Sequence, residues 1–237
     1  MVIARLLTPV PKDADSTKEF KASLKLERGL DAKMKVLVNN IRRTGQMSEH
    51  QRLLMRDSIR NSVQRIWVIG AQYAANFMER ELIMTQTDIE NIKALSQEFG
   101  DRMQWRIDNY VLNRMDSQEE NSKAEISTDF ITSTFAGYVA PRSLSVAIRE
   151  KARQITQSQF QSDGFGAMAA AASAADTTQE PHVVLKWITA NDDKVCPICS
   201  TLEGTLFEVD DPDVPEPDSD THPSCRCMLR LVEAEFQ

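Results

Sequence analysis

The feature that most constrains the fold is the placement of the four cysteines. All of them lie between Cys196 and Cys227, and the preceding 195 residues contain none. They form two short segments, Cys196-Pro-Ile-Cys199 and Cys225-Arg-Cys227, which are separated by 25 residues, and His222 stands three positions before the second segment. In a chain made in a reducing compartment, such local crowding is typical of a metal site rather than of a disulfide framework.

Signals for export or membrane insertion are missing from the sequence. No stretch approaches the roughly 20 apolar residues needed to span a bilayer. The N-terminus, MVIARLLTPVPKDADS, lacks a proper apolar core and a small-residue cleavage site. We therefore expect synthesis in a reducing cytoplasm, no membrane association and reduced cysteines, with disulfides as the minor alternative.

The cysteine spacing suits a structural zinc ion. Zn²⁺ prefers four nitrogen or sulfur donors in a tetrahedron, and this chain offers five for the four places. Cys196, Cys199 and Cys227 are the firmest candidates, and the fourth ligand is either Cys225 or His222. Closing a loop of about 25 residues costs only a few kcal/mol of chain entropy, whereas zinc binding in small sites is worth roughly 10–16 kcal/mol. A free thiol cluster without metal is the remaining alternative, and a full set of donors argues against an open, catalytic zinc.

Hydrophobic periodicity predicts helices over nearly all of residues 17–176. Ser48-x-x-Gln51 has the pattern of a capping box after Gly45, and the helix it begins is expected to end near Leu82. Thr87-x-x-Glu90 predicts the start of the next helix.

Glycine and proline then predict interruptions along the helical region. The pattern pauses at Gly100 and resumes over 103–115, and residues 116–123 read as a loop. A helix over 124–136 is expected to break at Gly137 and Pro141 before a further helix over 143–161. An Ala-rich run then continues as a helix to about residue 176.

The pattern changes to short β-strands after Pro181. Strands are expected over 182–188, 205–207 and 228–232, and an acidic, Pro-rich loop over 208–220 is expected to be solvated. The predicted organisation is an N-terminal arm (1–16), a helical domain (17–176) and a zinc-binding β-rich domain (177–237). The predicted fold class is mainly α with a small C-terminal α+β zinc-binding domain, built as an elongated helical bundle plus a β-hairpin zinc knuckle.

Charge and motifs exclude several classes of function. The net charge is -7, and the loop 208–220 carries seven acidic residues, which would repel phosphate. The sequence holds no Gly-rich phosphate loop, no Ser-His-Asp order and no HExxH pattern, and only three histidines. We therefore expect a non-enzymatic protein.

The cysteines stand in a longer pattern: Trp187-x-Thr189-x-x-Asp192 before Cys196, and His222-Pro-x-Cys225-Arg-Cys227 at the end. This string resembles the C-terminal signature of the phage Mu F-like minor head proteins, the phage head morphogenesis family, over roughly residues 143–230. The resemblance implies a structural minor capsid protein of a tailed bacteriophage, made in the host cytoplasm and located in the head or neck of the virion. It also implies association with the portal and with capsid or neck proteins. For the helical body we expect a homo-oligomer or several copies per particle.

Other functions stay open at this point. The chain could be a head–tail adaptor or an ejected virion protein, and it could contact packaged DNA. A nucleic-acid-binding zinc module is a separate alternative, although the acidic loop argues against it. Enzymatic activity is the least favoured hypothesis. It rests only on relatives in which this cysteine-rich zinc knuckle is fused to toxin or nuclease domains.

Overall fold

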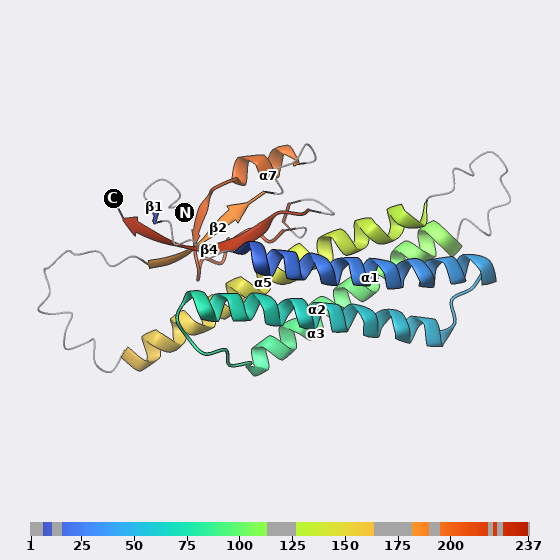
Figure 1. The fold of residues 1–237 in the computed structure, drawn as a ribbon, viewed down its shortest axis with the longest axis horizontal. Coiled ribbons are helices and arrows are strands. Elements are labelled where there is room, and N and C mark those ends of the chain that lie inside the picture. Colours follow the sequence, from blue (N-terminus) through green and yellow to red (C-terminus); the bar gives the residue numbers. More distant parts are fainter. Residues whose placement is uncertain are drawn as a thin grey trace, which may run out of the picture.

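The computed structural model describes residues 7–10, 16–112, 127–163, 182–189, 195–217, 220–221 and 225–236. Long helices pack side by side into an elongated bundle, and a small antiparallel sheet lies against one end of it (Figure 1). This confirms the predicted fold class, mainly α with a small C-terminal α+β part. Within the described part of the chain, no helix has both the length and the hydropathy that crossing a membrane requires.

Five helical elements of the described residues build the bundle. They are α1 (Ser16–Thr44), α2 (Glu49–Phe77), α3 (Gln86–Ile107), the π-helical turn η1 (Asp108–Leu112) and α5 (Thr128–Asp163). Each turns an apolar stripe inward, and the fully buried core includes Ile59, Trp67, Phe99 and Phe135. Burial of these stripes, more than intrinsic helix propensity, stabilises helices of this kind.

The junction between α1 and α2 confirms the predicted signals. Gly45 has φ 71° and its N–H donates to Ile41 O over 2.8 Å, which ends α1. Ser48 Oγ accepts from Gln51 N–H over 3.3 Å, and the Gln51 side chain accepts from Ser48 N–H over 2.8 Å. This reciprocal capping box satisfies two backbone donors at the start of α2.

The end of α2 differs from the prediction. The helix ends at Phe77, not near Leu82. Glu79 adopts a left-handed conformation with φ 54°, and Arg80 N–H donates to Ala75 O over 2.8 Å. This is a Schellman-type cap, which closes the last turn although no glycine marks the position.

Helix α3 starts earlier and runs further than predicted. Its N-cap is Thr85, with Asp88 as the reciprocal partner, so the predicted Thr87/Glu90 start is wrong by two residues. The predicted pause at Gly100 is also wrong, because the helix continues through it to Ile107. Phe99 and Met103 are fully buried on either side, and their packing maintains the helix through the glycine.

The predicted break at Gly137 and Pro141 is wrong as well. Residues 128–163 form one continuous helix with Pro141 inside it. Tyr138, Val139 and Leu144, which flank the proline, are buried in the core. The contacts of these side chains outweigh the roughly 3 kcal/mol that an interior proline costs a helix.

Among the described residues, the sheet has four antiparallel strands in the order β1-β4-β2-β3. The strands are β1 (Leu7–Val10), β2 (His182–Ile188), β3 (Leu206–Glu208) and β4 (Met228–Phe236), and the short helix α7 (Pro197–Leu202) lies between β2 and β3. The three predicted strands are present, although β4 is longer than expected. Part of the predicted N-terminal arm supplies β1, and β3 and β4 pair with opposite edges of β2 rather than with each other.

Helices and sheet share one hydrophobic cluster. Trp187 and Leu231 of the sheet pack with Tyr73 of α2 and Leu144 of α5, and the cysteine segments belong to the same cluster. Ser145 Oγ of α5 accepts from Leu229 N–H over 3.0 Å and donates to Pro141 O over 2.8 Å. The terminal module therefore packs firmly on the bundle.

Several predictions fall outside the described residues. They are the loop over 116–123, the Ala-rich helix to about residue 176, the connection over 176–181 and the position of His222. The domain boundaries at residues 16 and 176 stay predictions.

Candidate metal centre

Three of the predicted ligands come together in the fold. Cys199 lies in α7, and Cys225 and Cys227 lie just before β4, so segments distant in the sequence meet beside β2. The three sulfur atoms lie within 4.8 Å of one another, and all three residues are buried. The Sγ atoms of Cys199 and Cys225 are 3.5 Å apart.

Cys196 lies next to this trio without being one of its members. It is the N-cap of α7, and its Sγ accepts a hydrogen bond from Cys199 N–H over 3.3 Å. The side chain is half-buried, and Pro197 follows at the first helical position, where its missing N–H loses nothing. The cap thus fixes the relative position of the two cysteines of the C-x2-C segment.

The geometry of the sulfur atoms fits a tetrahedral thiolate site. With Zn–S bonds of about 2.3 Å, two sulfurs bound to one zinc lie roughly 3.8 Å apart. The 3.5 Å between Cys199 and Cys225 is close to this value, and all four cysteines are free thiols. A metal ion can therefore be held by Cys199, Cys225 and Cys227 with one further donor.

The three thiols differ in acidity. The hydrogen bond from Cys227 lowers the pKa of Cys225 to about 5, despite burial, and Thr221 adds a second hydrogen bond to its sulfur. Burial raises the pKa of Cys199 to about 12, and the hydrogen bond to Cys225 raises the pKa of Cys227. The protein alone thus stabilises one negative charge, and a bound divalent ion would stabilise the remaining thiolates.

The neighbouring charges connect this centre to α1. Burial raises the pKa of Glu27 of α1 to about 7. The positive charges of Arg226, which lies between the two cysteines of the second segment, and of Arg28 oppose this shift. The negative charge of Asp31 adds to it. Arg226 itself is exposed. The cysteine turn therefore lies within electrostatic reach of the first helix.

The acidic loop is only partly solvated. Asp210 and Asp213 are exposed as expected, but Val214 is buried. Glu216 forms ion pairs with Arg149 over 2.7 Å and with Arg142 over 3.6 Å, both on α5. The loop between the two cysteine segments is thus fastened to the bundle.

Sequence reasoning missed two contributors to this region. Thr221 and the pair Glu216–Arg149 support the second cysteine segment and its preceding loop. Neither forms part of a recognisable spacing pattern. Thr221 contributes a single hydroxyl group, and Glu216 and Arg149 are 67 positions apart in the sequence. His222, the fifth predicted donor, lies outside the described residues.

Part of the chain matches a known protein family. Residues 122–230 match the family model described as Phage Mu protein F like protein. This confirms the resemblance predicted from the sequence, and the match starts at residue 122 rather than near residue 143. It covers α5, β2, α7, β3 and the start of β4. No curated protein and no solved structure gave a significant match to the chain.

Proposed function

We propose, from the premise that residues 122–230 belong to the Phage Mu protein F-like family, that this chain is a structural protein of head morphogenesis in a tailed bacteriophage. The observation that carries the proposal is that the matched region contains the cysteine cluster, most of the sheet and the helix on which the sheet packs. The family resemblance thus covers one compact unit and not an isolated motif.

The proposed ion is Zn²⁺, held by Cys199, Cys225 and Cys227. Cys196 or His222 supplies the fourth donor. When bound, zinc supplies a cross-link between α7 and the start of β4 and takes part in no reaction. Support comes from the mutual distances of the three sulfurs and from their burial in the core shared by helices and sheet.

The proposed location is the virion, in the head or neck, with the portal and with capsid or neck proteins as partners. Several copies per particle and the lack of enzymatic activity remain predictions. Exposed aromatic side chains support contacts with other proteins: Trp105 is 56% exposed and Phe130 is 52% exposed. The ring of Tyr110 lies between them, with its centroid 5.5 Å from that of Trp105 and 6.4 Å from that of Phe130. Aromatic residues are enriched where proteins bind one another.

Purified particles test the proposed location. Quantitative mass spectrometry of gradient-purified virions is expected to find the chain at a fixed ratio to the major capsid protein. Particles emptied of DNA should retain it if it is part of the head or neck shell, and should lose it if it is ejected. Recovery of the chain from host lysate alone, and never from virions, would overturn the proposal.

Elemental analysis tests the metal. We expect one zinc per chain and its loss in Cys199→Ser, whereas Ser200→Ala, an exposed change in the same helix, should retain it. A metal-free native protein, or one in which the cysteines are oxidised partners, would refute the zinc site without touching the family assignment.

A further inference from the structure

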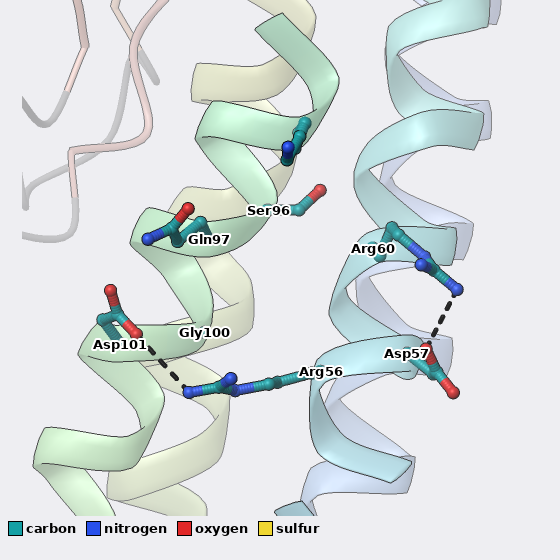
Figure 2. A pocket seen from close by; sticks show the side chains of 8 residues that line it. Arg56, Asp57, Arg60, Ser96, Gln97, Gly100 and Asp101 are labelled. Atoms are coloured by element: carbon teal, nitrogen blue, oxygen red, sulfur yellow. Dashed lines mark hydrogen bonds and ion pairs between the residues drawn. The ribbon is translucent and has the colours of Figure 1, made fainter. Parts of the chain in front are cut away.

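A surface pocket opens between α2 and α3, away from the metal centre. It has a volume of about 380 Å³. Apart from one glycine, the residues that line it carry charged or polar side chains: Arg56, Asp57, Arg60, Lys93, Ser96, Gln97, Gly100 and Asp101. All of these residues precede the region matched by the family model, so the family says nothing about them. Figure 2 shows Arg56 reaching from α2 across the pocket toward α3.

The cations of this pocket are only loosely neutralised. Three cations and two carboxylates line it, which leaves one net positive charge. Arg56 lies 3.9 Å from Asp101, and both side chains are 62% exposed. Arg60 pairs with Asp57 over 3.0 Å, while Lys93 has no hydrogen-bond or ion-pair partner among the described residues. Exposed pairs of this kind are worth at most about 1 kcal/mol, so a ligand can displace them.

Gly100 of α3 leaves room for the side chain of Arg56. A Cβ at Gly100 would lie 3.7 Å from Arg56 Cγ, so the aliphatic part of Arg56 crosses α3 where no side chain stands. Its guanidinium group lies beside Asp101 of α3 (Figure 2). An arginine held by its stem presents its planar donors with less loss of entropy on binding.

We propose that this pocket binds a phosphate group in the backbone of a nucleic-acid strand. A phosphodiester carries one negative charge and balances the net charge of the pocket, whereas a doubly charged free phosphate would leave it negative. Guanidinium groups match phosphate oxygens with paired hydrogen bonds.

A strand is favoured over a single anion because the cations continue along α2. Arg52 lies one helical turn before Arg56, and Arg60 one turn after it, at a spacing of roughly 6 Å per turn of four residues. A ligand with regularly repeated charges can contact successive members of this row.

The position of the pocket avoids the repulsion that the acidic loop would cause. Arg56 and Arg60 lie in the first half of α2, which begins at the end of the bundle remote from the sheet (Figure 1). The loop 208–220 is fastened to α5 beside the sheet through Glu216. The proposed contact is thus independent of the zinc site and of the proposed place in the virion.

Binding of a labelled single-stranded oligothymidine to the full chain, followed by fluorescence anisotropy over a salt series, tests the proposal. The affinity should fall with salt. Arg56→Gln and Arg60→Gln should each weaken binding and lower the slope of log K against log salt by about 0.7. Arg65→Gln is the matched control, since Arg65 is exposed and lies half a turn around α2 from Arg56.

Competition distinguishes the sources of the anion. Unlabelled oligothymidine should displace the probe at lower total charge than inorganic phosphate or polyglutamate. The proposal is overturned if the wild-type chain shows no binding at low salt, or if Arg65→Gln weakens binding as much as the pocket variants do. Equal displacement by polyglutamate or tighter binding of inorganic phosphate would also overturn it. Circular dichroism of each variant verifies that its fold is unchanged.

Discussion

The contact between α2 and α5 gives a sharp prediction, because Gly70 leaves no room for a larger residue. A Cβ at this position would lie 2.9 Å from Ala147 Cβ and 2.9 Å from the backbone oxygen of Leu144. Carbon atoms in contact normally stay roughly 3.5–4.0 Å apart. In Gly70→Ala the two helices must therefore separate locally by about 0.5–1 Å, and backbone oxygen cannot rotate away as a side chain can.

The magnitude follows from two opposing effects. Overpacking of this kind costs about 1–3 kcal/mol, and the backbone contact places Gly70→Ala toward the upper end. Alanine recovers about 1 kcal/mol through its higher helix propensity. We expect a net loss of about 2 kcal/mol, which corresponds to a fall in Tm of roughly 4–8 °C for a chain of this length.

Gly29 provides the matched control. It lies within α1, and a Cβ there would meet nothing within 4 Å. Gly29→Ala should therefore raise the free energy of unfolding by about 1 kcal/mol. Urea and thermal unfolding followed by circular dichroism measure both variants. If Gly70→Ala and Gly29→Ala change the free energy of unfolding in the same direction by similar amounts, α2 and α5 do not approach closely at Gly70. The double variant Gly70→Ala/Ala147→Gly should recover only part of the loss, since the Leu144 oxygen remains.

Three further predictions concern the core, a helix cap and the metal. Asp88→Asn should cost about 3–5 kcal/mol by leaving Lys151 buried without its charge partner, which now lies 2.5 Å away. Burial raises the pKa of Asp88, but hydrogen bonds from Lys151 and Thr85 outweigh this effect and hold the pKa below its usual value. The contribution of Asp88 to stability is therefore present above about pH 4 and is lost as the pH falls through the folded-state pKa. A pH series of unfolding curves should show this loss in the wild type but not in Asp88→Asn. Glu79→Gly should stabilise the chain by roughly 0.5–1 kcal/mol in urea unfolding, since glycine adopts the left-handed conformation without strain, and a loss of stability would contradict the assigned φ of 54°. A strong chelator should lower Tm in the wild type and leave Cys199→Ser unchanged, as measured by scanning calorimetry; an equal fall in both would show that the chelator acts elsewhere.

Local signals predicted the parts of the fold in which neighbouring residues decide the outcome. The capping box at Ser48 depends on hydrogen bonds within one short segment. The strand over residues 182–188 follows from local β-propensity and the short length of its apolar run. The cysteine spacing predicted one site with Cys196, Cys199 and Cys227 as the firmest ligands and either Cys225 or His222 as the fourth. Of these, the structure groups Cys199, Cys225 and Cys227, and Cys196 lies beside them.

Predictions failed where distant residues override local preference. Pro141 and Gly100 both interrupt helices in isolation, yet packing against other helices carries α5 and α3 through them. The N-cap of helix α3 is Thr85 and not Thr87 because Asp88, the capping partner of Thr85, is also buried against Lys151 from α5. No window of a single sequence contains that pairing, since the two residues are 63 positions apart.

The hydroxyl of Ser145 has a consequence for the metal centre. Its hydrogen goes to Pro141 O, and its oxygen receives the amide of Leu229 at the beginning of β4. A one-residue slip of β4 would leave this buried amide without an acceptor, at a loss of about 1–3 kcal/mol, and would turn every inward side chain of the strand outward. The helix therefore sets the register of the strand, and with it the place of Cys227 two residues upstream, before any ion arrives.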